Sequence, residues 1–496
     1  MESMLQLAIA RKFGQPGNNI ITKAVSPYGE TASFLGVTME SLLYSINAFI
    51  WGVPVLLLIL TTGIILSIRS RLAQIRLLPT AMKYFLDSFK KRNKHNVQIS
   101  GYRALCTALA ATVGTGNIAG VAGAIAIGGP GVIFWMWICA ILGMITKFAE
   151  VTLAVHFRYR KSNGEYIGGP MYTIEKGLSV KYNYLGYAYC FFGIIAALGI
   201  GNAVQINTVI ESITSIATQM SVKFGLGHRL ILGLVVAAFI VMIFKRGAGG
   251  IGRAAENLVP FASVFYILLA IIVLSRRYSR IPAVILDIIY GAFSPEAATG
   301  GMLASVFITL RVGVSRGVFT NEAGMGTASI AHASSNTNHP AEQGLMGIME
   351  VFLDTIVICT LTGLVILSSG IYIPYGSDQG VRLALEAFAY TLGDWSMIVI
   401  TALLCVFAFA TILGWGLYGG RCCQYLFGEK SWSLFVYGQS IAIILGAVLN
   451  TSSVWNITEI FNGLMAIPNL VAICALSSVF IRIIKDFQQN ENAYRY

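Results

Sequence analysis

The sequence predicts an all-α integral membrane protein, and three observations support that prediction. Of the 496 residues, 56% are hydrophobic and only 11% are charged, whereas a soluble protein has about 25% charged residues. The chain contains 52 glycines, a residue that is commoner in membrane helices than in soluble ones. Long apolar runs recur along it, and such runs must be helical because lipid offers the backbone no hydrogen-bond partners.

Eleven apolar segments are long enough, or nearly so, to cross a bilayer, which takes about 20 residues. Segment 230–244 is short, and segment 300–325 carries Arg311, Arg316 and Glu322. The predicted spans are 46–68, 104–126, 132–155, 186–208, 230–244, 257–274, 300–325, 345–369, 396–416, 433–449 and 461–481.

The order of the segments predicts two halves. If the first segment is an additional N-terminal helix, the other ten divide as five plus five, and an odd number of helices per half turns the halves in opposite directions, as in an inverted repeat. We therefore expect four regions. They are 1–100, with the additional helix and a basic cytoplasmic loop; 101–275, the first repeat; 296–484, the second repeat; and 485–496, a cytoplasmic tail.

The basic residues predict the orientation. Cytoplasmic loops of membrane proteins are enriched in Lys and Arg, and the stretch 69–103 contains nine of them. With that stretch in the cytoplasm, 22 basic residues lie inside and nine outside, although the cluster 276–280 opposes the trend. We expect a multi-pass protein of the cell membrane with its N-terminus outside and its C-terminus cytoplasmic. The first twenty residues contain no signal-peptide pattern.

Two segments at matching places are interrupted. Segments 104–126 and 300–325 each begin a half, and both have glycine and polar residues in mid-membrane. Discontinuous helices at corresponding places indicate a transporter's binding site. Gly114 and Gly116 each weaken a helix by about 1 kcal/mol. A break there frees N–H groups for a carboxylate and carbonyl groups for a cation; the alternative is close helix packing through the GxxxG of Gly116 and Gly120.

Ionisable residues within the spans have several possible roles. Glu322 could pair with Arg316, cap a half-helix or bind a ligand directly. Glu350 and Asp354 could form a proton relay or face a polar interface. Lys147 and Glu150, three residues apart, are expected to pair with each other.

Several long strings resemble one family. They are ALAATVGTGNIAGVAGAIAIGGPG, GGPMYTIEKGL, GNAVQINTV and RGVFTNEAGMGTASIAHASS, the last followed by HPAEQGLMGIMEVFLDTIVICTLTG. In order along residues 40 to 480, they resemble the alanine or glycine:cation symporter family. That resemblance implies a leucine-transporter-like architecture, five plus five inverted helices with discontinuous first and sixth core helices, plus one additional helix at the N-terminus.

The resemblance also implies the cargo and its site. The cargo would be a small neutral amino acid of alanine or glycine size, of either enantiomer, coupled to Na⁺ or H⁺. Gln205, Phe319 and Trp415 could instead be packing or interhelical contacts, as could Asn202. The substrate-binding residues that the resemblance implies are Gly114, Thr115, Gly116, Asn117, Gln205, Phe319, Thr320, Asn321, Met325, Gly326 and Trp415.

A cation site is implied between the first and eighth core helices. Hard cations prefer oxygen ligands, and the ligands would be the Thr411 hydroxyl with backbone oxygens of Val113 and Phe407. The chain has Ala410 where the family pattern usually has serine, so the coupling ion stays open between Na⁺ and H⁺.

Other classes of function are less compatible with the sequence. A channel would need a continuous polar pore lining, and an enzyme would need a motif such as HExxH or GxSxG; neither is present. The net charge of +12 follows the positive-inside pattern and needs no nucleic-acid partner. We expect the lipid bilayer, a small neutral amino acid and a cation as partners, and no cofactor.

Overall fold

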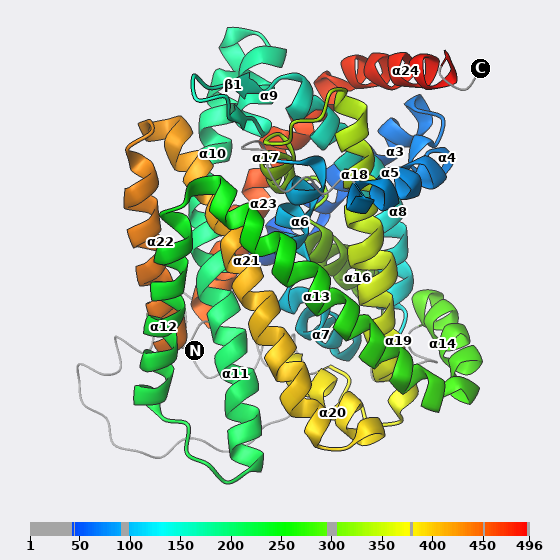
Figure 1. Cartoon of the computed structure of the whole chain (residues 1–496). Helices are drawn as coiled ribbons and strands as arrows, with labels where there is room; N and C mark the ends of the chain where they lie inside the picture. The colour runs from blue at the N-terminus through cyan, green and yellow to red at the C-terminus, as the bar shows by residue number, and fades with distance from the viewer. Residues whose placement is uncertain are drawn as a thin grey trace, which may run out of the picture. The chain divides into compact units, whose positions relative to one another are not determined.

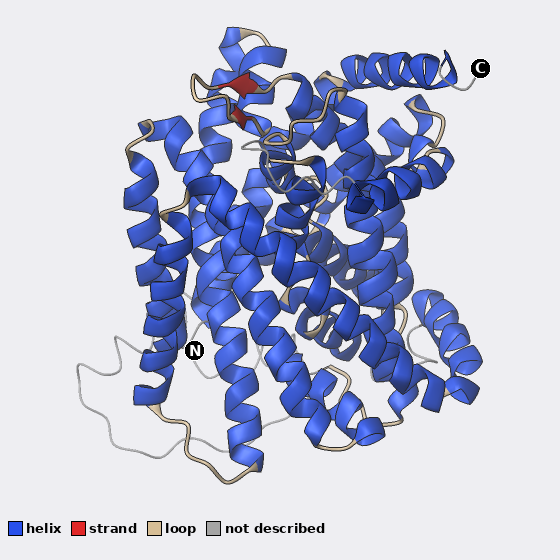
Figure 2. Cartoon of the chain, viewed as in Figure 1, coloured by secondary structure: helices blue, strands red, loops and turns tan. Residues whose placement is uncertain are grey.

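Regular structure in the computed structural model is almost entirely helical (Figure 1, Figure 2). The structure describes residues 42–43, 45–90, 99–294, 305–376, 380–449 and 452–493, and residues 46–496 belong to one compact unit. A small antiparallel hairpin, β1 (Tyr159–Arg160) with β2 (Tyr166–Ile167), is the sheet formed by these residues. The predicted all-α class is confirmed.

The first half follows the predicted order. It begins with the additional helix, continues with an interrupted helix, and ends with four further spans. These elements are α3 (Val53–Arg69); α6 (Gly101–Thr112), η1 (Thr115–Asn117) and α7 (Ala119–Gly128); α8 (Val132–His156); α10 (Asn183–Leu198), η3 (Gly199–Ala203) and α11 (Val204–Gln219); α12 (Leu226–Phe244); and α13 (Gly247–Arg276).

The second half repeats this order with a second interrupted helix. Its elements are α16 (Val306–Asn321) and α17 (Thr327–His332); α18 (Pro340–Val351), η5 (Phe352–Cys359) and α19 (Thr360–Ser369); α21 (Trp395–Phe427); α22 (Ser431–Val448); and α23 (Ser452–Ala475). Among the described residues, nine helices are long and apolar enough to cross a membrane, and α6 with α7, bent by 58°, makes a tenth. The eleventh predicted segment is α16 with α17, which are too short to qualify singly.

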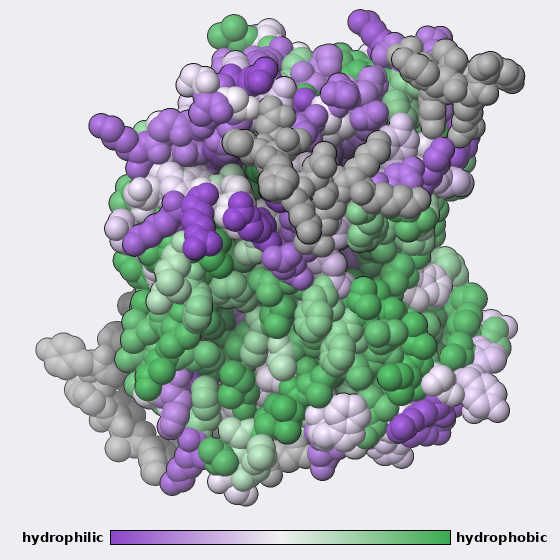
Figure 3. Space-filling model, viewed as in Figure 1, coloured by the Kyte–Doolittle hydropathy of each residue, from purple (hydrophilic) through white to green (hydrophobic). Residues whose placement is uncertain are grey.

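Shorter helices lie at the two ends of the spans. At the end that holds the C-terminus in Figure 1 are α4 (Ala73–Arg76), α5 (Leu78–Lys90), α9 (Pro170–Gly177) and α24 (Ser477–Ala493). At the other end are α14 (Ile281–Phe293) and α20 (Gly380–Leu392). On the face shown in Figure 3, hydrophobic residues cover the middle of the spans and hydrophilic residues gather toward the ends.

The structure corrects the end of the last predicted span. Segment 461–481 was predicted to be continuous, but α23 ends at Ala475 and residues from Ser477 belong to α24. Phe480, Ile483 and Phe487 of α24 are buried and Arg482 is exposed. An amphipathic helix of this kind buries one face, and its apolar residues extended the hydropathy signal. Parts of the predicted N-terminal region (1–41 and 91–98) and of the second repeat (296–304) lie outside the described residues.

Close packing brings the eighth core helix, α21, onto the first interrupted helix. A Cβ atom added to Gly414 of α21 would lie 2.7 Å from the Cβ of Ala111 and 2.8 Å from its backbone nitrogen. Only glycine permits helices to approach so closely. Because of this contact, the side chains one turn away on α21 reach the break that follows α6.

Candidate substrate and cation site

The first interruption separates α6 from α7. Val113 (φ −78°, ψ 93°) and Gly114 (φ −141°, ψ −157°) are extended, and a 3₁₀ turn over Thr115–Asn117 follows. The N–H groups of Thr115 and Gly116 open this turn, so they have no acceptor within the helix. The predicted residues of this segment therefore lie in a true break and not in a continuous helix packed through GxxxG.

The second interruption separates α16 from α17. Glu322, Gly324 and Gly326 all have positive φ (54°, 94° and 75°), a conformation that favours glycine and strains glutamate. The predicted Phe319, Thr320 and Asn321 form the last turn of α16, and Met325 and Gly326 lie within the break. Thr320, Asn321 and Met325 are buried, whereas Phe319 is half-buried.

The two interruptions face each other. A Cβ atom added to the half-buried Gly116 would lie 3.5 Å from ring atoms of Phe319 and 3.5 Å from the Thr320 methyl group. These are ordinary van der Waals distances. Residues separated by about 200 positions in the sequence thus line the same space, as matching broken helices predict.

Gln205 contacts the first interruption from α11. Its Oε1 accepts a hydrogen bond from the Thr115 hydroxyl (2.8 Å), and its Nε2 donates to the Ile200 carbonyl (3.1 Å) within the π-helical segment η3. Asn202 donates to Ala197 O of its own helix (2.6 Å). The structure therefore brings Gln205, and not Asn202, against the break.

Trp415 lies beside the second interruption. It is 2% exposed, its Cβ packs against Gly201 of η3, where an added Cβ would lie only 2.3 Å away, and its side chain faces Glu322. Trp415 and Met325 are thus buried behind the break, whereas Gly116 and Phe319 are the more accessible predicted residues.

Thr411 supplies an oxygen at the first interruption. Its hydroxyl is buried and has no hydrogen-bond partner among the described residues. A Cβ at Gly114 would lie 2.5 Å from this oxygen, so the hydroxyl points directly at the break. Val113, which precedes Gly114, and Phe407, which lies about one turn before Thr411 on α21, are both buried. An unpartnered hydroxyl beside carbonyls released from a helix is the donor set that a small hard cation prefers.

Two of the predicted ion pairs are different in the structure. Lys147 pairs with Glu350 (3.4 Å) instead of Glu150, because both charges on the buried helix α8 find partners on other elements. Arg316 pairs with Glu459 (3.4 Å), and Glu322 accepts a 2.5 Å hydrogen bond from the hydroxyl of Thr327, the first residue of α17. Glu322 follows the last residue of α16, and its side chain binds the side chain of Thr327 and no backbone N–H group of α17.

Sequence reasoning missed the groups that hold the two breaks in place. Glu150 accepts hydrogen bonds from the N–H groups of Gly324 (2.9 Å) and Gly326 (3.1 Å), and Asp354 accepts one from the Asn117 side chain (2.6 Å). Both carboxylates are fully buried. The sequence did contain one indication of their importance. An ionisable residue inside a membrane span costs free energy, and such residues usually have a functional role.

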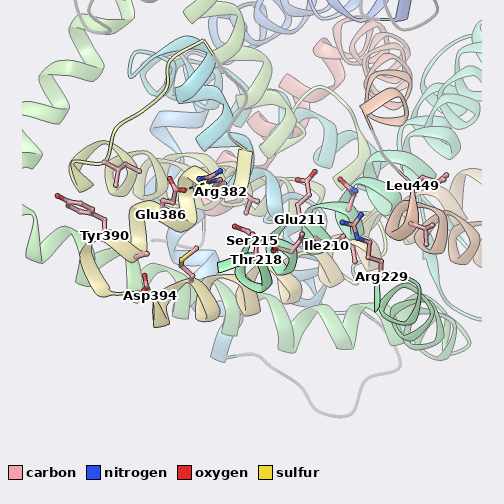
Figure 4. Close-up of a pocket in the computed structure, with 17 residues that line it drawn as sticks. Ile210, Glu211, Ser215, Thr218, Arg229, Arg382, Glu386, Tyr390, Asp394 and Leu449 are labelled. Carbon is pink, nitrogen blue, oxygen red and sulfur yellow. Dashed lines mark hydrogen bonds and ion pairs between the residues drawn. The ribbon is translucent and has the colours of Figure 1, made fainter. Parts of the chain in front are cut away.

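A separate pocket opens at the end of the spans opposite the C-terminus (Figure 1, Figure 4). It has a volume of about 1190 Å³ and is lined by residues of α11, α12, α20, α21 and α22. Glu211, Arg229, Arg382, Glu386 and Asp394 give it charges of both signs. None of the predicted site residues line it, so it is distinct from the space between the interruptions.

Comparison with known proteins places this geometry in a family. The model described as the sodium:alanine symporter family matches residues 37–495. A protein of Methanococcus maripaludis named sodium/alanine symporter AgcS is 41% identical over 452 residues, which cover 90% of this chain and 97% of that protein. A Bacillus subtilis protein named probable sodium/glutamine symporter GlnT is 36% identical and covers 92% of each chain.

A solved structure shares the fold. The crystal structure of MhsT in complex with L-phenylalanine matches with a TM-score of 0.54 at 16% identity, covering 79% of this chain and 99% of that chain. At this identity the likeness concerns the fold alone. It confirms the leucine-transporter-like architecture that the sequence predicted.

Proposed function

The chain belongs to the sodium:alanine symporter family, and from that premise we propose that it carries alanine or glycine into the cell together with Na⁺. It is a multi-pass membrane transporter and not an enzyme. The observation that supports the proposed cargo is the approach of the two interruptions at Gly116 and Phe319. The interruptions offer backbone N–H and C=O groups without helical hydrogen bonds, and Phe319 offers one aromatic ring. Such groups suit a small zwitterion.

Each end of the amino acid has a matching group. The substrate carboxylate would accept hydrogen bonds from the N–H groups of Thr115 and Gly116. Its ammonium group would meet carbonyl oxygens of the second interruption. The side chain would face Phe319, with Met325 and Trp415 packed behind. Selection would then be by size, since a longer side chain would clash with this wall.

The coupling ion would bind at Thr411. Sodium would be held by the Thr411 hydroxyl with backbone oxygens of Val113 and Phe407, and its presence would satisfy a buried oxygen that has no hydrogen-bond partner among the described residues. Ala410 offers no second hydroxyl, which keeps H⁺ as the alternative ion. Alternating access would follow from rocking of the four interrupted and adjacent helices (α6 with α7, α8, α16 with α17, and α18 with α19) against the rest.

A larger neutral amino acid is the second candidate cargo. The relative named for glutamine has nearly the same length of match as the relative named for alanine, so membership of the family alone does not choose between them. The half-buried Phe319 beside Gly116 favours the smaller substrate, because little width separates the two breaks.

Uptake by purified protein in vesicles tests the proposal. Labelled alanine, glycine and glutamine are offered with an inward Na⁺ gradient or an inward H⁺ gradient, each imposed alone. We expect saturable uptake of alanine and glycine that requires the Na⁺ gradient. Uptake driven only by the H⁺ gradient would change the ion, a preference for glutamine would change the cargo, and uptake without saturation would indicate a channel.

A further inference from the structure

Each half of the molecule carries a buried carboxylate on the helix that follows its interrupted helix. Glu150 lies on α8, which follows α6 and α7, and Asp354 lies in η5, which is part of the helix that follows α17. Both are at most 3% exposed. Each one contacts the interruption of the opposite half, so the two contacts cross between the repeats.

Glu150 gathers donors from the second interruption. Its Oε1 accepts hydrogen bonds from Gly324 N (2.9 Å), Gly326 N (3.1 Å) and the Asn469 side-chain amide (2.7 Å). The same Asn469 amide also donates to Gly324 O (2.9 Å). Hydrogen bonds to an ionised acceptor are about twice as strong as neutral ones. One carboxylate oxygen therefore holds two backbone N–H groups that a break in the helix has left without helical partners.

Asp354 contacts the first interruption through Asn117. The Asn117 amide donates to Asp354 Oδ1 (2.6 Å), and Asn117 Oδ1 accepts from Gly114 N (2.8 Å). The other carboxylate oxygen accepts from the Thr355 hydroxyl (2.8 Å), which itself accepts from Asn321 (3.1 Å). Through these hydrogen bonds, Asp354 connects Gly114, which lies beside the Thr411 hydroxyl, with Asn321, the last residue of α16.

Neither carboxylate forms a salt bridge in the described parts of the chain, although Lys147 lies close enough to Glu150 to interact with it electrostatically. Lys147, the ammonium group nearest in sequence to Glu150, forms its ion pair with Glu350.

A buried charge is tolerated when it accepts hydrogen bonds. The second interruption supplies two donors to Glu150 Oε1, and Asn469 supplies a third; Glu150 Oε2 has no partner among the described residues. Asn117 of the first interruption supplies one donor to Asp354, and Thr355 supplies the other. The charge of each carboxylate and the shape of the opposite break therefore depend on each other.

We propose that Glu150 and Asp354 are paired positioning residues, each holding the interrupted helix of the opposite half in the shape that receives the substrate. This inference rests on the proposed function, because it assigns the same space between the breaks to the cargo. It differs from a ligand role, since the carboxylates bind the backbone and side chains of the interruptions. The crossed contacts would also make the two breaks move together during transport.

The test compares Asp354→Asn, Asn117→Ala and the double variant with the wild-type protein at matched levels in vesicles. We expect Asp354→Asn to raise KM for the transported amino acid by about tenfold or more, the loss of one hydrogen bond to a charged group, with a smaller change in maximal rate. Since Asp354 acts through Asn117, the double variant should be no worse than Asn117→Ala alone. Additive losses would contradict the inference.

Glu150→Gln provides the second arm, with Asn469→Ala as the milder variant if the first does not accumulate in the membrane. Hydrogen exchange should become faster at residues 322–326 in these variants and at residues 114–118 in Asp354→Asn. The matched control is Glu256→Gln, a buried acid that pairs with Arg103 away from both breaks (2.9 Å), for which KM should be unchanged. Unchanged KM and exchange in the Glu150 and Asp354 variants would overturn the inference, whereas a wild-type protein that transports none of the amino acids would instead refute the proposed function.

Discussion

Gly116 and Gly114 are both glycines of the first interruption, but the structure needs them for different reasons. A Cβ at Gly114 would overlap the Thr411 hydroxyl at 2.5 Å, whereas a Cβ at Gly116 would make ordinary contacts of 3.5 Å with Phe319 and Thr320. The first position requires glycine for packing. At the second position a Cβ atom would fit without overlap, and we propose that the substrate lies against this face of Gly116.

Replacement of Gly116 by valine should therefore abolish uptake. The side chain would fit between the breaks only by occupying the substrate's place, so the protein should still reach the membrane and melt near the wild-type temperature. Uptake of labelled alanine and the melting temperature are measured on the same preparation. Gly438→Ala on α22, where an added Cβ meets nothing within 4 Å, is the control, and normal uptake by Gly116→Val would contradict the assigned site.

Thr411→Val separates a cation ligand from a packing residue. The hydroxyl is buried and has no hydrogen-bond partner in the part of the chain that the structure describes, so its replacement by an isosteric methyl group should leave stability unchanged or raise it by about 1 kcal/mol. We expect the Na⁺ concentration for half-maximal uptake to rise at least about tenfold, the equivalent of about 1.4 kcal/mol of lost binding. Thr411→Ser should behave like the wild-type protein. A Thr411→Val protein with unaltered Na⁺ dependence would exclude this oxygen as a ligand.

Single residues of the site could be predicted from the sequence where they interrupt the helix that contains them. Gly114, Gly116 and Gly326 break an otherwise apolar helix, and that signal is visible in the sequence. Glu150 and Asp354 were not assigned to the breaks, because their partners are more than 170 and 230 positions away, respectively. Lys147 was paired with Glu150 by spacing alone, but its partner Glu350 lies on another helix.

At the scale of elements, hydropathy predicted the spans but not their irregularities. The segments η3 and η5 are π-helical, and each adjoins a contact to a break, through Gln205 and through Asp354. Such segments often occur at functional sites. Asn202 in η3 and Asp354 in η5 are polar, but single polar residues in an apolar run do not distinguish a π-helical segment from an ordinary α-helix. The broken helices were predictable because glycine and polar residues interrupt the apolar run.

A buried ion-pair network joins three helices. Lys147 of α8 pairs with Glu350 of α18 (3.4 Å), whose other oxygen lies 2.9 Å from His332 Nε2 of α17. The Gln343 amide donates to Gly101 O (3.2 Å) and lies 2.7 Å from His332 Nδ1. A donor on that nitrogen leaves the proton on Nε2, where it donates to Glu350. His332 thus joins α17 to α18 through Glu350 and Gln343.

Loss of one partner in this network should be more harmful than loss of both. Lys147→Met leaves the Glu350 charge buried, which costs about 3–5 kcal/mol when a buried pair is broken. Lys147→Met with Glu350→Gln removes both charges and should recover most of that stability. The measurement is the apparent melting temperature in detergent, with Arg382→Ala, which breaks an exposed pair with Glu386, as a control of little effect. A double variant as unstable as Lys147→Met would refute this view of the network.

For the whole molecule, the distribution of charge supports the proposed orientation. The helices α4 and α5, which hold most of the described part of the basic stretch, lie at the same end of the spans as α9 and α24 (Figure 1), and hydrophilic residues gather at that end on the face shown in Figure 3. The cluster 276–280, which opposed the trend, is engaged by the protein: Arg276 donates to Thr391 O (3.2 Å), and Arg277 lies over the Tyr390 ring (5.2 Å). Contacts with α20 thus give these arginines a structural reason to lie at the end of the spans opposite α9 and α24.

The orientation can be tested on one span, because Lys181 and Lys223 flank the helix formed by α10, η3 and α11 and are both exposed. With the C-terminus in the cytoplasm, the positive-inside distribution places Lys181 inside and Lys223 outside. A membrane-impermeant maleimide should therefore label Lys223→Cys on intact cells and Lys181→Cys only after permeabilisation. The eight native cysteines are buried or half-buried, and the unmodified protein gives their background. The reverse labelling would show that the orientation in the membrane is the opposite of the proposed one, and the pocket in Figure 4 would then open to the cytoplasm.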